Sequence, residues 1–470
     1  MSNENMSRES KTTEIQTLLQ TGRHAEAERR LREICAGPAA DAESWFLLGA
    51  LSGTRGDAAG AEGCFRQALT LKPDFLQARF NLGIALRDQG RFDAARAELE
   101  AVTAVRPGHA EACNALGYVH VRLERQDDAE RCFRAALAGN PVFPDALTNL
   151  GNVLASRRRW AEAVGLYRRA LDVAPGHGDA ALNLGSALAA QGQIEEATAA
   201  FRRAIAINPA HAEAYVQLGI MLKKLGKAPE AEQAFREALR IRPDHAEAGY
   251  FLATLGGVTA PPTAPVEYVA QLFDQYAETF DAELVGKLQY HIPEAMLDAI
   301  QTVLAGRRNL DVLDLGCGTG LCGPLFRPLA RTLTGVDLAP KMIAKARARE
   351  VYDDLELGDL TTALHSRAGT LDLVIAADVF VYIGELETVF DATAKALRPG
   401  GLFAFSVESA KAEEGDGYVL RGSGRYAHAP IYITTLAFRS GFGPGLSKEV
   451  CIRLDGNQPI AGMLYVLINK

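Results

Sequence analysis

The chain has 470 residues, of which 48% are hydrophobic and 23% charged, and its formal net charge is −8. This length predicts two to four domains, and the composition excludes global disorder. Residues 1–257 carry a net charge of −1 and residues 258–470 a net charge of −7, so a broad nucleic-acid-binding surface is not expected.

Segments that would place the chain in a membrane or direct it out of the cell are not expected. No run of about 18 apolar residues predicts a transmembrane helix. The polar residues 1–14 lack the apolar core of a secretory signal. The seven cysteines are scattered without a C-x-x-C pair, which predicts reduced, mostly buried thiols and no zinc site. We therefore expect a cytoplasmic protein without a bound metal.

A repeat with a period of 34 residues fills the first half of the chain. Each unit has Leu-Gly, an Ala 12 residues after the Gly, a large apolar residue 4 further on, and a Pro 8 beyond that. Small residues let two antiparallel helices approach closely, and Pro ends each unit because it cannot continue a helix. The repeated glycines are Gly49, Gly83, Gly117, Gly151, Gly185 and Gly219.

This pattern resembles the tetratricopeptide repeat. One unit matches nearly all of its signature, at Trp45, Leu48, Gly49, Ala61, Phe65, Ala68 and Pro73. The resemblance implies an all-α solenoid of about seven repeats over residues 8–256. We expect a degenerate first unit at about 8–41 and a capping helix from residue 246, because terminal repeats are atypical. Such arrays mostly bind a protein or peptide in their concave groove.

Carboxamide side chains stand two residues before the repeated glycine in four units: Asn81, Asn149, Asn183 and Gln217. They incompletely resemble the asparagine ladder of the O-linked N-acetylglucosamine transferase array, since Leu47 and Ala115 interrupt the series. A carboxamide can both donate to and accept from a peptide backbone. Two interpretations stay open. Either the three asparagines bind a peptide, or Asn is simply common at this position of the repeat consensus, which we call consensus drift.

The period stops at a Pro- and Gly-rich linker over residues 257–266, which predicts an extended, semi-rigid connection. Residues 268–281 then have the apolar spacing of an amphipathic helix. Short apolar runs alternate with helical stretches from there on, which predicts an α/β domain over 267–470 with a mostly parallel sheet. The last two strands should pair antiparallel across the segment DGNQPIAG. The expected strands are 310–315, 332–337, 354–357, 371–377, 401–407, 447–453 and 462–468.

The run VLDLGCGTGLCG at 312–323 follows the first expected strand. As G-x-G-x-x-G it would be the dinucleotide fingerprint of Gly318, Gly320 and Gly323. As D-x-G-x-G-x-G, from Asp314, it resembles motif I of class I S-adenosylmethionine-dependent methyltransferases. The flanking acids favour the second interpretation. A common dehydrogenase dyad consists of a Tyr followed four residues later by a Lys, and this pair is absent from the second half of the sequence.

The resemblance to class I methyltransferases implies a Rossmann-like fold and a cofactor, S-adenosyl-L-methionine. It implies that Asp314 holds the amino-acid end of the cofactor, Asp337 its ribose and Asp359 its adenine amino group, with Leu360 against the ring. The loop and strand ends complete this site through Gly316, Cys317, Gly318, Gly320, Leu338 and Ala377. Tyr276 and Phe280 are candidates for an aromatic lid, or else they are ordinary core residues of their helix.

The methyl acceptor is not identified by any motif. A pocket for it should lie beyond the carboxyl ends of the strands. Asp378, Tyr426 and His428 are the candidate catalytic residues, with His428 as a possible base and an arginine such as Arg425 holding an acidic substrate. Alternatively, Asp378 caps a helix and the 415–433 segment is a surface loop whose Tyr and His pack on the sheet edge. The absence of an N/D-P-P-Y run makes DNA adenine methylation unexpected.

The two halves together resemble bacterial tetratricopeptide-repeat methyltransferases. The expected function is methyl transfer from S-adenosylmethionine, with the solenoid recruiting a protein that is the substrate or carries it. Two alternatives remain, a scaffold protein with an idle cofactor domain and a methyltransferase-like domain that hydroxylates instead.

Overall fold

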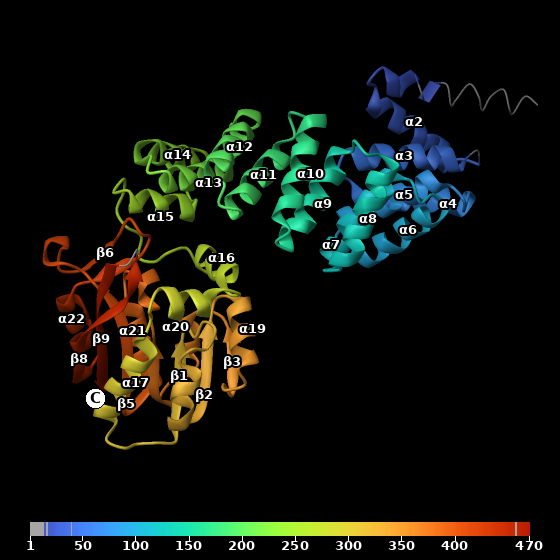
Figure 1. Ribbon diagram of the computed structural model, residues 1–470. Coiled ribbons are helices and arrows are strands. Elements are labelled where there is room, and N and C mark those ends of the chain that lie inside the picture. Colours follow the sequence, from blue (N-terminus) through green and yellow to red (C-terminus); the bar gives the residue numbers. More distant parts are fainter. Residues whose placement is uncertain (1–13, 16, 39, 456–457) are drawn as a thin grey trace, which may run out of the picture. The chain divides into compact units, whose positions relative to one another are not determined.

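The computed structural model describes residues 14–15, 17–38, 40–455 and 458–470 (Figure 1). It divides into two compact units, Met1–Gly226 and Lys227–Lys470. Part of the degenerate repeat expected at 8–41 lies outside the described residues. None of the helices in the described ranges has both the length and the apolar character needed to cross a bilayer.

The first unit consists of helices joined in antiparallel pairs, as the repeat predicts. In five of the repeats, from Gly49 to Gly185, the repeated Gly meets the large residue of the second helix of its pair. A Cβ on Gly117 would lie 2.6 Å from Phe133, and one on Gly151 would lie 2.5 Å from Tyr167. The helices are α2 (His24–Ala36), α3 (Ala42–Thr54), α4 (Ala58–Leu71), α5 (Leu76–Asp88), α6 (Phe92–Val105), α7 (Ala110–Arg122), α8 (Gln126–Gly139), α9 (Pro144–Ser156), α10 (Trp160–Val173), α11 (Gly178–Ala190), α12 (Ile194–Ile207) and α13 (Ala212–Lys224).

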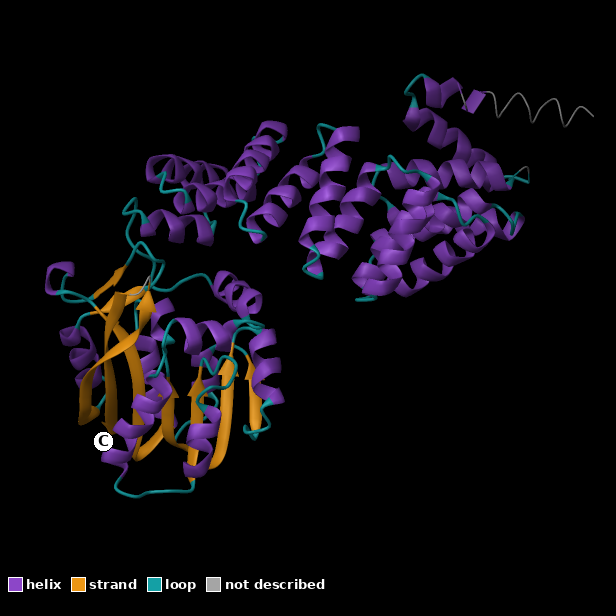
Figure 2. Ribbon diagram, viewed as in Figure 1, coloured by secondary structure: helices purple, strands orange, loops and turns teal. Residues whose placement is uncertain are grey.

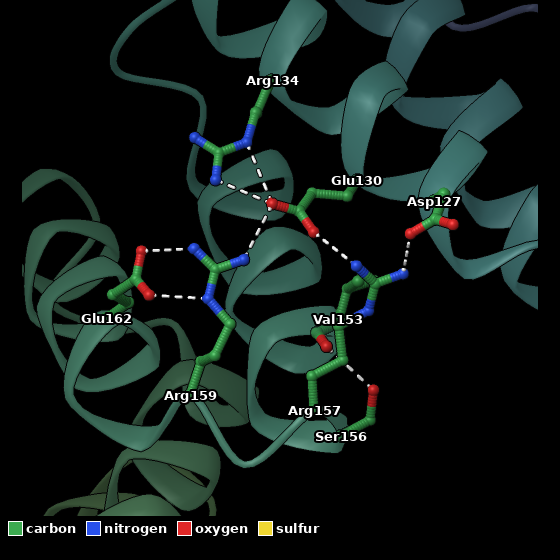
Figure 3. A network of polar contacts seen from close by, with 8 residues as sticks. All are labelled: Asp127, Glu130, Arg134, Val153, Ser156, Arg157, Arg159 and Glu162. Atoms are coloured by element: carbon green, nitrogen blue, oxygen red, sulfur yellow. Dashed lines mark hydrogen bonds and ion pairs between the residues drawn. The ribbon is translucent and has the colours of Figure 1, made fainter.

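Ion pairs join successive repeats at the turns between helices. Glu130 of α8 accepts from Arg157 at 2.9 Å and from Arg159 at 3.1 Å, both in the turn that follows α9 (Figure 3). Arg134, one helical turn after Glu130, also contacts this carboxylate, and Arg159 reaches Glu162. The basic run at 157–159 therefore belongs to a turn between helices, where acidic partners from two helices neutralise much of its charge.

The second unit begins with the two helices that end the repeat pattern, α14 (Ala228–Ile241) and α15 (Ala246–Thr254). The Pro-rich linker after α15 is extended. Its Pro262 carbonyl accepts from the amides of Gly384 and Glu385, at 2.8 and 2.9 Å, and the amide of Ala264 donates to Tyr382. The linker thus runs along the segment that follows the fourth strand.

An α/β domain makes up the rest of the second unit, with helices on both faces of the sheet (Figure 2). Val312 and Leu313 point into separate buried clusters, because successive side chains of a strand face opposite ways. The helices are α16 (Val266–Tyr276), η1 (Ala282–Lys287), α17 (Ile292–Leu304), α18 (Gly323–Phe326), η2 (Arg327–Leu329), α19 (Pro340–Ala348), α20 (Leu360–His365), η3 (Phe380–Tyr382), α21 (Glu387–Ala396), η4 (Ala412–Glu414) and α22 (Pro430–Arg439).

The central strands pair in parallel in the order β3-β2-β1-β4-β5, and β9 pairs antiparallel with β5 and β8. All seven expected strands are present, and the last two form the expected antiparallel pair. Their connecting residues 456–457 lie outside the described residues. The strands are β1 (Leu310–Leu315), β2 (Ala330–Asp337), β3 (Asp354–Leu357), β4 (Leu371–Ala376), β5 (Leu397–Ser409), β6 (Tyr418–Leu420), β7 (Tyr426–His428), β8 (Phe442–Asp455) and β9 (Gln458–Asn469).

The 415–433 segment, expected as a Gly-rich insertion, contains the short antiparallel ribbon β6–β7. β7 pairs in parallel with β5 at Glu408 and Ser409, and β9 also pairs with Glu408. A strand residue pairs with one neighbour on each side, and β9 takes one side of Glu408. β7 therefore takes the other side of β5, which is the side that pairs with β4 nearer the start of β5. The ribbon therefore continues the sheet beyond the carboxyl end of β4.

Candidate functional site

A cavity lies at the carboxyl ends of β1, β2, β3 and β4, the edge of the sheet at which the sequence predicts a binding site. Segments far apart in the sequence meet there, namely the linker, α16, the glycine loop and the ends of four strands. Its lining includes Thr263, Phe273, Phe280, Tyr290, Asp314, Gly316, Cys317, Gly318, Thr319, Asp337, Leu338, Asp359, Leu360, Ala377, Asp378, Tyr382 and Arg425. Ten of the twelve cofactor residues expected from the sequence line this cavity. Gly320 and Tyr276 do not.

The glycines of the loop after β1 differ in what surrounds them. A Cβ on Gly316 would lie 2.7 Å from Val379, so that position is closed by packing. A Cβ on Gly318, whose φ is +56°, would have Phe280 at 3.9 Å as its nearest neighbour and would point into open space. Gly320 packs against Tyr352 instead of facing the cavity. A ligand can therefore approach the backbone closely at Gly318.

Asp337, at the end of β2, is held by two backbone amides. Gly318 donates to its Oδ2 at 2.9 Å, and Ala339 donates to its Oδ1 at 2.8 Å. Burial raises the pKa of this carboxyl, and the amide bonds oppose the rise. Each carboxylate oxygen has a second lone pair, so Asp337 can still accept from two ligand hydroxyls.

Asp314, at the end of β1, is buried and accepts a hydrogen bond of 2.6 Å from the Tyr352 hydroxyl. Burial raises its pKa to about 7, the Tyr352 bond lowers it, and the charge of Asp337 raises it. A cation placed beside Asp314 would favour its ionised form. The site can thus bind an ammonium group here at the cost of ionising this carboxyl.

Asp359 lies at the N-terminus of α20 and caps that helix. Its Oδ1 accepts from the amides of Thr361 and Thr362, at 2.9 and 3.1 Å. The cap fixes the carboxylate at the rim of the cavity, next to Leu360. The apolar Leu360 and the carboxylate of Asp359 therefore lie side by side. An adenine ring could pack on the first while its amino group donates to the second.

One of the two residues expected to form an aromatic lid, Phe280, lines the cavity. Phe280 lines the cavity together with Phe273, and their ring centroids lie 5.9 Å apart. Tyr276 is 47% exposed and lies outside the lining, which does not fit the lid role assigned to it from the sequence. α16 ends at Tyr276, so residues beyond it no longer follow the expected helical spacing. The sequence did not single out Phe273, since the amphipathic spacing alone does not distinguish the apolar positions that face the cavity.

The segment that follows Phe280 is tied to the glycine loop by a polar cluster. Asp281 accepts from the Thr319 hydroxyl and from the guanidinium of Arg349. Arg349 also donates to the Thr319 carbonyl at 2.6 Å. Three segments of the chain are thereby joined at one edge of the cavity.

The far side of the cavity, after β4, carries a buried group of charges. Asp378 lines the cavity and has a φ of +58°, a strained backbone for a residue with a side chain. Arg453 is 2% exposed and contacts both Asp378 and Glu408. Burial raises the pKa of Asp378 to about 6, while Arg453 lowers it and Glu408 raises it.

Arg453 could not be anticipated from the sequence. It belongs to β8, whose pairing with β9 shifts register between Cys451 and Arg453. The shift turns a side chain of this strand into the interior. Asp378 does not cap a helix, which was the alternative role expected for it. The N-terminal cap of the short helix η3 is Val379.

Tyr426 and His428 are fully buried in β7 and lie outside the cavity lining. The Tyr426 hydroxyl donates to the Pro261 carbonyl at 2.7 Å. His428 Nε2 lies 2.9 and 3.1 Å from the carbonyl oxygens of Ile383 and Gly384, and burial lowers its pKa to about 4. This placement fits packing on the sheet edge and does not fit the catalytic role assigned from the sequence.

A second, polar groove lies in the first unit. Asn149 and Asn183 line it, whereas Asn81 is not among its lining residues. The Asn149 amide donates to Asn114 at 3.0 Å, and the Asn183 amide donates to Asn152 at 2.9 Å. Two of the three expected asparagines thus belong to paired carboxamides in a groove.

Comparisons with known proteins agree with both halves of the chain. Residues 313–405 match a family model described as a methyltransferase domain. Two tetratricopeptide-repeat models match residues 12–74, 54–117, 114–179, 150–212 and 182–246.

Individual relatives match the methyltransferase part at low identity. A malonyl-[acyl-carrier protein] O-methyltransferase of Salmonella typhimurium is 30% identical over 138 residues, which are 29% of this chain and 52% of that protein. A ubiquinone biosynthesis O-methyltransferase of Bartonella tribocorum is 36% identical over 98 residues, 20% of this chain and 39% of that protein. An 18S rRNA (guanine-N(7))-methyltransferase of Bos taurus is 32% identical over 137 residues, 29% of this chain and 47% of that protein. The chain spans about half, or less, of the length of these relatives. The fold, the repeat pattern and these matches agree that the chain is a tetratricopeptide-repeat protein that carries a methyltransferase domain.

Proposed function

We propose that the chain transfers a methyl group from S-adenosyl-L-methionine to an acceptor that its helical repeats help to recruit. The observation that carries the proposal is one cavity that combines an open glycine turn with three carboxylates from the ends of successive strands. Gly318, Asp314, Asp337 and Asp359 all line it. A site of this composition suits a ligand with an ammonium group, a ribose and an amino-substituted ring.

The residues fit that cofactor on their chemistry. The open cradle at Gly318 leaves room that any Cβ would fill. Asp337 would accept from the ribose hydroxyls, Asp314 would bind the ammonium group, and Asp359 would accept from the adenine amino group. When bound, S-adenosylmethionine supplies a sulfonium methyl, whose carbon–sulfur bond breaks with its electron pair left on sulfur as the acceptor atom bonds to carbon.

The protein's contribution to this reaction is positioning and the exclusion of water. Phe273 and Phe280 cover the cavity with aromatic rings. Asp378 and Tyr382 line its acceptor side. Asp378 is the catalytic candidate that remains, and it would orient the acceptor or take its proton, because a carboxylate with a pKa of about 6 is largely ionised at neutral pH.

The groove of the first unit supports recruitment of a protein or peptide. Its paired carboxamides at Asn149 and Asn183 can donate to and accept from a peptide backbone. Two relatives are named for a malonyl group on an acyl carrier protein and for ubiquinone biosynthesis. An acceptor carried by a protein would use both parts of this chain.

The test is transfer of labelled methyl from S-adenosylmethionine into a lysate of a strain that lacks the protein. The full chain should label a protein band or a small molecule, and Gly318→Val should label neither. Binding of S-adenosylhomocysteine without any transfer would contradict the proposed catalysis and favour a scaffold with an idle domain. Failure to bind it would contradict the cofactor assignment.

A further inference from the structure

The turn between β6 and β7 brings a basic side chain to the cavity. Arg425 is the one basic residue in the cavity lining among the residues that the structure describes. The acidic lining residues Asp314, Asp337 and Asp359 belong to the proposed cofactor end. Arg425 instead accompanies Thr263 of the linker and Tyr382 of η3, on the side of the cavity that follows β4.

The Arg425 guanidinium has no hydrogen bond or ion pair with another residue in the described part of the chain. Two other arginines near this side of the cavity do have acidic partners. Arg421, at the other end of the same turn, pairs with Glu408 and Glu414, and Arg453 pairs with Asp378. Arg425 is half-buried, and a guanidinium at a cavity without a protein partner is available to a ligand that supplies the anion.

The backbone of this turn is held in place from several sides. The Arg421 amide donates to the Arg425 carbonyl, and the Gly424 amide donates to the Arg421 carbonyl, both at 2.9 Å. The hydroxyl of Tyr250, from α15, donates to the Gly424 carbonyl, and its ring packs against those of Tyr268 and Tyr426. Tyr250 is fully buried. A helix of the repeat pattern thus supports the residue next to Arg425.

We propose that Arg425 binds an anionic group of the methyl acceptor, a carboxylate or a phosphate monoester, and that Tyr250 acts as a positioning residue for its turn. This proposal rests on the proposed methyl transfer. A planar guanidinium with several N–H donors matches either anion by paired hydrogen bonds. Because the other arginines on this side of the cavity are already paired within the protein, Arg425 would be the group that selects an acidic acceptor.

The experiment uses the full chain and the lysate fraction that it labels. Arg425→Ala should raise the Michaelis constant for that fraction by about 10- to 100-fold, the usual worth of a hydrogen bond to a charged group. Arg425→Lys should recover part of the loss by restoring the charge. The affinity for S-adenosylhomocysteine, measured by calorimetry, should not change in either variant. Arg439→Ala, at an exposed arginine of α22, is the matched control.

Tyr250→Phe keeps the ring and removes the hydroxyl. It should raise the Michaelis constant in the same direction and leave the turnover number and the S-adenosylhomocysteine affinity unchanged. A purely structural role would instead lower the melting temperature and cofactor affinity together.

Two treatments of the acceptor fraction separate the two anions. Amidation of carboxylates with carbodiimide and methylamine should abolish labelling if the group is a carboxylate, and phosphatase should abolish it if the group is a phosphate monoester. Labelling that survives both treatments, or that is equal for the wild type and Arg425→Ala, would overturn this proposal alone. A wild-type chain that labels nothing would contradict the proposed function itself.

Discussion

The guanidinium of Arg453 donates to both carboxylate oxygens of Asp378, at 3.1 and 2.9 Å, from a strand 75 residues further along the chain. The same guanidinium contacts Glu408. Arg453 and Glu408 are nearly inaccessible to solvent, with 2% of each exposed. Arg453 therefore lies between two acidic side chains beside the cavity, and the arrangement is sensitive to the loss of its charge.

Arg453→Met should destabilise the protein by about 3–5 kcal/mol, because it leaves Asp378 without its cation and Glu408 with only the more distant Arg421. Denaturant unfolding monitored by circular dichroism measures this loss. Adding Asp378→Asn and Glu408→Gln to Arg453→Met should recover much of it, since the remaining groups are neutral. A stability equal to the wild type in the single variant would mean that water reaches these carboxylates.

Gly318→Val should abolish the binding of S-adenosylhomocysteine, since its side chain would occupy the open cradle. Its φ of +56° also disfavours a β-branched residue. Gly318→Ala is the graded control, because a single Cβ would meet only Phe280 at 3.9 Å. Calorimetry measures affinity, and thermal melting checks that each variant is folded. Wild-type affinity in the valine variant would place the ligand elsewhere.

Asp337→Ala should weaken S-adenosylhomocysteine binding by about 1–3 kcal/mol, because the ribose hydroxyls would lose their acceptor. The change also frees the amides of Gly318 and Ala339, which would loosen the glycine loop. Asp337→Asn keeps one carbonyl acceptor and should retain part of the affinity. Calorimetry measures the affinity of both variants, and wild-type affinity in Asp337→Ala would mean that the ribose is bound elsewhere.

Asp314 should make cofactor binding depend on pH. Its pKa is raised to about 7, so a site that binds ammonium only to the carboxylate gains about tenfold in affinity between pH 6 and pH 8. Calorimetry with S-adenosylhomocysteine at the two pH values tests this. Asp314→Asn should bind weakly at both, and a wild-type affinity independent of pH would remove Asp314 from the ammonium site.

The same shift affects the stability of the protein without ligand. A carboxyl whose folded pKa is raised stabilises the fold fully below its ordinary pKa of 3.8, and this contribution is lost as the pH rises through 7. Relative to Asp314→Asn, the wild type should therefore lose stability between pH 4 and pH 8. Melting temperatures across this range measure the difference, and a parallel pair of curves would contradict it.

The groove asparagines should contribute to partner affinity. Asn149→Ala with Asn183→Ala should weaken a bound protein partner by about 1–3 kcal/mol, at roughly 0.5–1.5 kcal/mol for each hydrogen bond. Asn81→Ala is the matched control, because Asn81 has the same place in its repeat but does not line the groove. The comparison uses partners recovered from lysate, and equal recovery by the double variant and the control would leave the carboxamides as consensus drift.

Local patterns determined the elements and the residues of the proposed cofactor end of the cavity. The 34-residue spacing predicts helix pairs because each Gly must face a large side chain at a fixed separation, as Gly151 and Tyr167 do. The glycine loop and its acids can also be predicted from the sequence, because each lies at or just after the end of a predicted strand. Asp314, Asp337 and Asp359 accordingly lie together in one cavity.

Only the tertiary structure decided the acceptor side. His428, Tyr426 and Arg425 are neighbours in the sequence, yet the pairing of β7 with β5 buries the first two while the turn before β7 brings Arg425 to the cavity. Arg453 reaches Asp378 because a register shift in β8 turns it inward. The sequence by itself therefore determined the repeats, the strands and the glycine loop, which depend on local spacing. The side chains that face the acceptor depend on strand pairing and burial between distant segments, and only the folded chain brings these together.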